Sequence, residues 1–97
     1  MNIGFLEARQ LDPDFDCFFL HDLDMLPQND LNAYKCQNDF PTHFASNASQ
    51  FDGTQIYGSF FGGVNAFTKQ QFEKINGFSN KYFDWGGEGK LMLKIYV

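Results

Sequence analysis

The sequence lacks several features that would assign it to a class of protein at once. It has no cluster of Lys or Arg, and its 7 basic and 12 acidic residues give a formal net charge of −5. Without a basic surface, no binding of nucleic acid or anionic lipid is expected. No apolar run approaches the roughly 20 residues that span a bilayer, and the first residues lack the basic start and apolar core of a signal peptide.

Aromatic residues, by contrast, are abundant. They make up 19% of the 97 residues, and 13 of them are Phe. This apolar content is too high for an intrinsically disordered chain. The length allows one small domain at most, or a piece of a larger one.

The first half of the chain contains one helical and one strand-like segment. Residues 3–10 are expected to form a helix, with Ile3 and Leu6 on one side and Phe5 nearby. Residues 15–20 form a short, nearly continuous apolar run, which is typical of a strand covered on both faces.

The second half repeats these elements in the opposite order. Residues 59–64 form another apolar stretch, interrupted by a glycine pair. A helix is expected over residues 68–76, because Thr68 and Gln71 have the spacing of a capping box and Gly77 can end the helix. The order of helix, strand, polar loop, strand and helix predicts an α/β fold.

Asp22 and Asp24 are the most specific feature. They follow the apolar run of residues 15–20, and residues at i and i+2 of an extended segment point to the same side. Open α/β sheets bind ligands at the carboxyl ends of their strands. Two facing carboxylates repel unless a cation intervenes, and Mg²⁺ or Mn²⁺ prefers such oxygen ligands. The pair therefore predicts a metal and phosphate site.

Two other interpretations of this pair stay open on the residues alone. The carboxylates can be solvated acids in a loop, because Asp-x-Asp is a short pattern. An aspartyl phosphatase also has Asp-x-Asp after an apolar strand, with the first Asp as nucleophile, although residues 25–27 depart from its usual continuation. A calcium EF-hand is excluded, because the central Gly and terminal Glu of its loop are missing.

The only cysteines are Cys17 and Cys36, and their spacing fits no zinc motif, with or without the two histidines. They are either a disulfide in a secretory compartment or two buried thiols in the cytosol. Asn47 begins an N-glycosylation acceptor sequence, which matters only in a secreted protein. Aromatic residues stand beside glycine pairs at residues 60–63 and 85–88, a composition that suits sugar binding or simply tight turns.

Several longer motifs follow one another along the chain: FDC at 15–17, HDLD at 21–24, PQNDLNAYKC at 27–36, FGGVNA at 61–66, KQQF at 69–72, INGF at 75–78 and WGGE at 85–88. In this order they resemble the β-1,4-galactosyltransferase family. The resemblance covers residues 1–88, which we interpret as part of a catalytic domain, and leaves 89–97 as a divergent end.

The resemblance implies a fragment of a GT-A-type nucleotide-sugar transferase domain, of the α/β class. Members of the family are type II Golgi membrane proteins with a lumenal catalytic domain, whereas this sequence contains no anchor. They use manganese to transfer galactose, or N-acetylgalactosamine in related enzymes, from a UDP-sugar to a terminal N-acetylglucosamine of a glycan, with inversion. The expected cofactor is therefore manganese, and the expected partners are a UDP-sugar donor and that acceptor.

The resemblance also implies roles for individual residues. Asp24 matches the manganese ligand, and Cys17 and Cys36 match a disulfide pair of the family. The residues expected at the donor are Asp22, Leu23, Asp24, Phe60 and Trp85, and those expected at the acceptor are Gly87 and Glu88. Phe60 stands where the vertebrate galactosyltransferases have a Tyr that helps to select the donor sugar.

The sequence departs from the family directly after Glu88. The family continues with aspartates, of which the first is the catalytic base, whereas this chain has Gly89 and Lys90. Glycine cannot accept a proton, and the later Met and His metal ligands of the family are also missing. We therefore predict no catalytic residue here and no sugar transfer by this chain alone. The alternative is a non-catalytic binder of nucleotide sugars or glycans. An incomplete sheet also predicts a tendency to aggregate.

Overall fold

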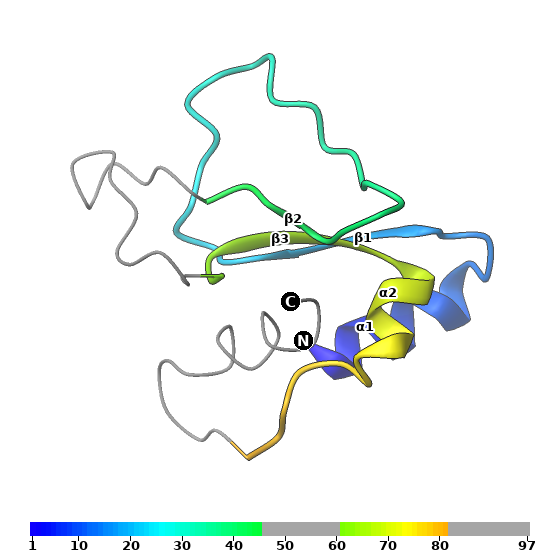
Figure 1. The fold of residues 1–97 in the computed structure, drawn as a ribbon. Coiled ribbons are helices and arrows are strands. Elements are labelled where there is room, and N and C mark those ends of the chain that lie inside the picture. Colours follow the sequence, from blue (N-terminus) through cyan, green and yellow to red (C-terminus); the bar gives the residue numbers. More distant parts are fainter. Residues whose placement is uncertain (46–60, 82–97) are drawn as a thin grey trace.

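The computed structural model describes residues 1–45 and 61–81. Its elements are α1 (Asn2–Leu11), β1 (Cys17–His21), β2 (Thr42–His43), β3 (Val64–Thr68) and α2 (Lys69–Lys74). Helices and strands are mixed, as the sequence predicted, and Figure 1 shows their arrangement. Among the described residues, no helix is long and apolar enough to cross a membrane.

The three strands form one sheet in the order β1-β3-β2, and both pairs of neighbours are antiparallel. Ala66 of β3 lies opposite Phe19 of β1 and Thr42 of β2, which fixes the register. The argument that placed the acidic pair at the carboxyl edge of an open α/β sheet does not hold for these strands, because β1 and β3 run in opposite directions. The β1–β3 pairing nevertheless brings the end of β1 to the start of β3.

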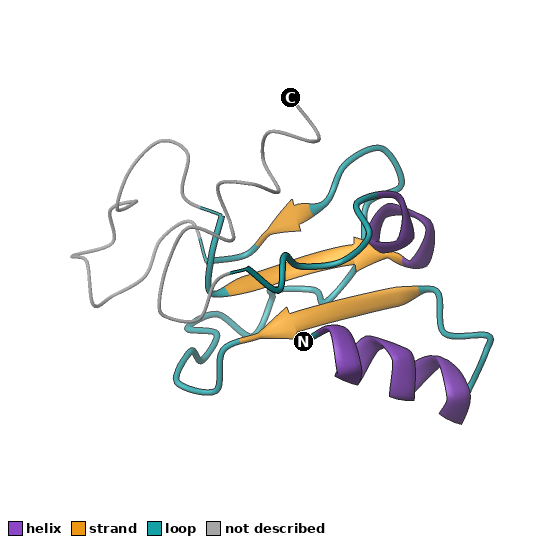
Figure 2. Ribbon diagram, turned by 90° about the horizontal axis from the view of Figure 1, so that it is seen from below, coloured by secondary structure: helices purple, strands orange, loops and turns teal. Residues whose placement is uncertain are grey.

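The two helices and the long loop after β1 lie on opposite faces of the sheet (Figures 1 and 2). Strand β1 alternates accordingly, with Phe18 and Leu20 buried on the helix side and Cys17, Phe19 and His21 half-buried on the loop side. The strand is therefore fully covered on one face only. It begins at Cys17 rather than at residue 15, because the chain before it is in a turn.

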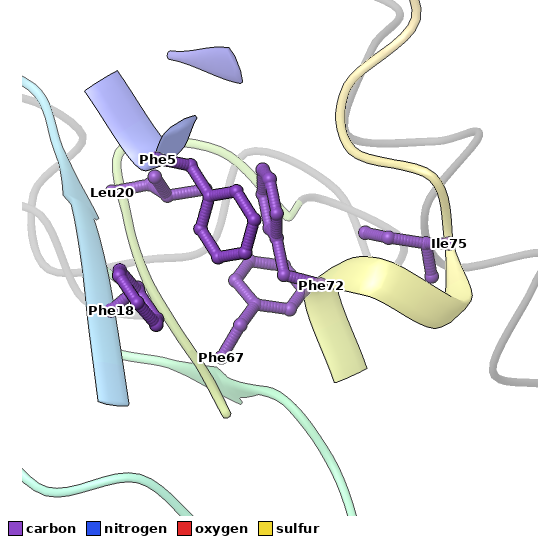
Figure 3. Close-up of a cluster of buried hydrophobic side chains, with 6 residues drawn as sticks. All are labelled: Phe5, Phe18, Leu20, Phe67, Phe72 and Ile75. Atoms are coloured by element: carbon purple, nitrogen blue, oxygen red, sulfur yellow. The ribbon is translucent and has the colours of Figure 1, made fainter. Parts of the chain in front are cut away.

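The core lies between the sheet and the helices, where side chains from four elements meet (Figure 3). Phe67 of β3 is completely buried, and its ring contacts Phe72 of α2 edge-on at a centroid distance of 5.6 Å. Burial of one such side chain contributes about 1.5–3 kcal/mol. The members of this cluster are Phe5, Phe18, Leu20, Phe67, Phe72 and Ile75.

Helix α1 turns a different side to the core than its pattern indicates. Phe5 is buried, and the centroid of its ring lies 4.6 Å from the ring centroid of Phe18 and 4.3 Å from that of Phe72. Ile3 and Leu6, which define the expected apolar side, are 76% and 54% exposed. The aromatic residue takes the buried position because it reaches rings on both β1 and α2.

Helix α2 begins as the sequence predicts. The hydroxyl of Thr68 accepts the backbone N–H of Gln71, and the side-chain oxygen of Gln71 accepts the backbone N–H of Thr68, so the capping box is complete. The helix itself ends at Lys74, before the predicted residue 76. Asn76 and Gly77 follow with positive φ angles of 58° and 71°, which confirms the predicted end at the glycine.

Strand β3 occupies residues 64–68, not the predicted stretch 59–64. Gly63 stands directly before it with a φ of +80°, a conformation that an extended strand of L residues does not adopt. The glycine pair therefore precedes the strand and forms the connection into it. The first two residues of the predicted stretch lie outside the described residues.

Candidate functional site

The two aspartates lie in a turn at the end of β1. The backbone N–H of Met25 donates to the carbonyl of Asp22 at 3.3 Å, which closes the segment 22–25, hereafter the acidic turn. Asp24 and Leu23 are exposed at its tip, whereas Asp22 is half-buried. The expectation that an extended backbone aligns both carboxylates is therefore wrong. The turn instead directs Asp24 into solvent and leaves Asp22 nearer the sheet.

The glycine pair 62–63 packs directly against the acidic turn. The backbone N–H of Asp22 donates to the carbonyl of Gly63 at 3.0 Å. A Cβ at Gly63 would lie 2.6 Å from the sulfur of Met25 and 2.8 Å from the Cβ of Ala45. Glycine is required here because the protein's own side chains occupy that space. Two motifs that are distant in the sequence thus form one structural unit.

His43 holds the other carbonyl of the glycine pair. Its Nε2–H donates to Gly62 at 2.8 Å, and its ring lies 5.2 Å from that of Phe61. Burial lowers the pKa of His43 below its usual value of 6.5, and the hydrogen bond to Gly62 opposes this shift in part. The imidazole therefore favours its neutral form. In the sequence this histidine was considered only as a zinc ligand.

His21 contacts the acidic turn from the strand side. Its Nδ1 lies 2.6 Å from the carbonyl oxygen of Asp22, and its Nε2 lies 3.1 Å from the hydroxyl of Tyr34. The two rings are stacked, with an interplanar angle of 12°. Sequence reasoning missed this pair. Alternation along β1 was the available signal, since it places His21 on the face of Cys17, toward the loop.

The loop after the acidic turn is fixed at several points. Cys17 and Cys36 form a disulfide with a Cα–Cα distance of 5.7 Å, as the resemblance implied. The buried side chain of Gln71 donates to the carbonyls of Gln37 and Asn38 at 2.9 and 3.1 Å. Gln71, which completes the capping box of α2, therefore also anchors the loop.

A cleft of about 560 Å³ lies beside this disulfide. Both cysteines line it, together with the side chains of Lys35 and Lys69. It is lined by residues from the start of β1, the loop and the start of α2, whereas the acidic turn follows the end of β1. Both cysteines are half-buried at its wall.

Among the described residues, those of the acidic turn are the candidates for binding a divalent cation. Within residues 1–45 and 61–81, no group of three or more His, Cys, Asp or Glu side chains is placed to hold a metal ion. Asp24 offers an exposed carboxylate, which is the donor type that Mn²⁺ accepts, but further ligands must come from elsewhere. The other predicted site residues lie outside the described ranges: Asn47, Phe60, Trp85, Gly87 and Glu88, with Gly89 and Lys90 after them.

Comparison with known protein families shows the class of protein to which the chain belongs. Residues 1–37 match the family described as the N-terminal region of glycosyl transferase group 7, and residues 42–94 match the family described as the N-terminal domain of galactosyltransferase. The acidic turn lies in the first match, and the glycine pair lies in the second. These matches cover nearly the whole chain and make it a group 7 glycosyltransferase sequence.

Individual relatives narrow the assignment. A β-N-acetyl-D-glucosaminide β-1,4-N-acetylglucosaminyl-transferase of Lymnaea stagnalis is 49% identical over 90% of this chain and 18% of its own length. β-1,4-Galactosyltransferase 2 of Cricetulus griseus is 48% identical over 91% of this chain and 24% of its own. Human β-1,4-galactosyltransferase 4 is 44% identical over 91% and 25%. The chain belongs to the β-1,4-galactosyltransferase family.

Two consequences follow from this membership. The aspartyl phosphatase interpretation of Asp22 and Asp24 is no longer tenable, because that chemistry belongs to another family. The chain spans only 18% to 25% of the length of these three relatives, so it corresponds to a part of them.

Proposed function

We propose that this chain is the donor-binding part of a β-1,4-glycosyltransferase with a GT-A-type domain. The whole enzyme transfers a hexose from a UDP-sugar to a terminal N-acetylglucosamine of a glycoprotein or glycolipid glycan, with inversion. The observation that carries the proposal is the hydrogen bond from Asp22 to Gly63. It joins the acidic turn, which carries Asp22, Leu23 and Asp24 of the expected donor residues, to the glycine pair that stands just after Phe60 in the sequence.

The donor is held by Asp22, Leu23 and Asp24, with Asp24 as the protein ligand of manganese. The exposed carboxylate at the tip of the turn is accessible to a cation and to diphosphate oxygens. When bound, the metal neutralises charge on the departing diphosphate. The remaining ligands come from the donor and from residues beyond the described ones.

Phe60 and Trp85 complete the donor side. Phe60 stands three residues before Gly63 in the sequence. An aromatic ring there suits the apolar face of a hexose. The named relatives include galactosyltransferases and an N-acetylglucosaminyltransferase, which supports a UDP-hexose donor without fixing which one.

The acceptor side is incomplete. Gly87 and Glu88 contact the N-acetylglucosamine acceptor, but Gly89 has no side chain to take the proton from the attacking hydroxyl. This chain therefore binds donor and acceptor without transferring sugar. The disulfide supports an oxidising compartment, here the Golgi lumen, where Asn47 is a candidate for glycosylation.

Calorimetric titration of the full-length protein with UDP-galactose tests the proposal. We expect saturable binding that requires MnCl₂, is lost in Asp24→Asn and persists in Asp14→Asn, which changes an exposed acid before β1. Transfer of radiolabelled galactose to N-acetylglucosamine is measured in parallel and should be absent for a protein that consists of residues 1–97 alone. Binding of UDP-galactose that does not require manganese, or that persists in Asp24→Asn, refutes the proposed site. Sugar transfer by this chain refutes the prediction that it has no catalytic base.

A further inference from the structure

The carbonyl oxygen of Asp22 makes one contact within the acidic turn and one with a side chain outside it. It accepts the N–H of Met25 at 3.3 Å within the turn and lies 2.6 Å from Nδ1 of His21. A carbonyl oxygen can only accept, so Nδ1 carries the hydrogen in this contact. His21 is therefore a side-chain donor to the backbone of the turn, from the last position of β1.

The hydroxyl of Tyr34 fixes the ring that makes this bond. With the hydrogen on Nδ1 directed at the carbonyl of Asp22, Nε2 lies 3.1 Å from the hydroxyl of Tyr34, a group that can both donate and accept a hydrogen bond. The two hydrogen bonds thus link Tyr34 to His21 and His21 to the backbone of Asp22. Stacking of the two rings holds the same orientation.

Tyr34 is itself held by contacts that lie away from the acidic turn. The centroid of its ring lies 4.8 Å from the ring centroid of Phe19 and 6.0 Å from that of Phe44. Two residues further along, Cys36 is joined to Cys17, and the next backbone carbonyl accepts the side chain of Gln71. The position of the tyrosine hydroxyl is therefore set by the sheet and by α2.

We propose that His21 and Tyr34 are positioning residues for the acidic turn. They do not contact the nucleotide sugar. They fix the backbone at Asp22, and through it the direction in which Asp24 presents its carboxylate. The expected change in Mn²⁺ affinity rests on the proposed function. The expected change in the acidic turn itself does not depend on any ligand. Loss of one such hydrogen bond changes the corresponding equilibrium about three- to tenfold.

The test uses the full-length protein with three variants and two measurements. His21→Phe keeps a ring and removes both hydrogen bonds, Tyr34→Phe removes only the hydroxyl, and His21→Asn returns a donor near the position of Nδ1. Amide hydrogen exchange reports the turn at Met25, and electron paramagnetic resonance reports the affinity for Mn²⁺ with UDP.

We expect His21→Phe to speed exchange at the Met25 amide and to weaken Mn²⁺ binding, each about three- to tenfold. Tyr34→Phe should have a smaller effect of the same sign, and His21→Asn should restore most of both. The matched control is Asn2→Ala, which removes the side-chain hydrogen bonds between the start of α1 and the backbone of Phe78, away from the loop that carries Tyr34. It should leave both readouts at the acidic turn unchanged.

An unchanged Met25 amide in His21→Phe overturns the inference, as does a His21→Asn variant no better than His21→Phe. Exchange at the core residue Phe67 shows whether each variant is folded. If the unmodified protein does not bind Mn²⁺ at all, the proposed function fails, and the Met25 amide alone then decides the positioning role. The two failures are therefore distinguishable.

Discussion

The backbone N–H of Asp22 donates to the carbonyl of Gly63, so the acidic turn and the glycine pair share one hydrogen bond across the ends of β1 and β3. Met25 packs over Gly63 in the space that a Cβ would fill. The residues expected at the donor and the backbone that supports them are thus coupled. Changes at the glycine should reach the aspartates.

Gly63→Ala should destabilise the protein and disturb the acidic turn. The added methyl group would lie 2.6 Å from the sulfur of Met25, at a backbone φ of +80° that L residues rarely adopt. We expect a loss of about 1–3 kcal/mol in the free energy of unfolding, measured with urea. Weaker Mn²⁺ binding should accompany it.

Gly4→Ala is the matched control for this substitution. Gly4 lies within α1, and a Cβ there would have no atom within 4 Å. Alanine favours the helix over glycine by about 1 kcal/mol, so this variant should be more stable. If both alanine variants have the same stability, the contact between Met25 and Gly63 is not the constraint described.

Reduction of the Cys17–Cys36 disulfide should release the loop that carries Tyr34. The two cysteines are 19 residues apart, and closing a loop of that size stabilises a fold by about 3 kcal/mol. Urea unfolding with and without a phosphine reductant should show this difference. A Cys17→Ser/Cys36→Ser variant should match the reduced protein and be insensitive to the reductant. Equal stability in both conditions would contradict the role of the disulfide.

The stability of the protein should depend on pH through His43. Its folded-state pKa is lowered by burial, so the unfolded chain binds the proton more readily. Stability is therefore complete above pH 6.5 and is lost as the pH falls from 6.5 toward the lower, folded pKa. His43→Gln keeps an N–H donor and does not titrate, so it should flatten this part of the urea midpoint curve. An unchanged slope in that variant would show that His43 does not contribute.

The exposed apolar side of α1 should promote aggregation of the isolated chain. Ile3 and Leu6 are 76% and 54% exposed, and Leu11 is 85% exposed. Ile3→Glu/Leu6→Lys should raise the concentration at which light scattering appears, with little change in unfolding free energy. A large loss of stability in this variant would mean that these side chains are buried. A sharp, cooperative thermal transition without scattering in the unmodified chain would contradict the expected aggregation.

The elements that sequence reasoning predicted best are those fixed by local chemistry. Helix α2 begins at the capping box of Thr68 and Gln71 and is closed by Gly77, because these signals act within a few residues. The buried side of α1 was not predictable, because periodicity does not reveal which apolar side chain meets rings from other elements.

The candidate site shows the same limit. The acidic motif was identified from its residue pattern and the disulfide pairing from the resemblance, but the turn at Asp22 and its bond to Gly63 arise from strand pairing. The contact between His21 and Tyr34 depends on a loop folded back by the disulfide and by Gln71. Alternation along β1 indicates the face on which His21 lies, but a single sequence does not identify Tyr34 as its partner.

The most direct test of the central claim is paramagnetic line broadening in the amide spectrum of the full-length protein, titrated with MnCl₂ and UDP-galactose. We predict that the amides of residues 23–25 and 62–63 broaden first. Helix α2 begins at the far end of β3, about 15 Å along the strand, and should broaden later. In Asp24→Asn the early broadening should disappear. Broadening centred on α2 or on the disulfide cleft, or early broadening unchanged in Asp24→Asn, would contradict the claim that the acidic turn and the glycine pair form the donor site.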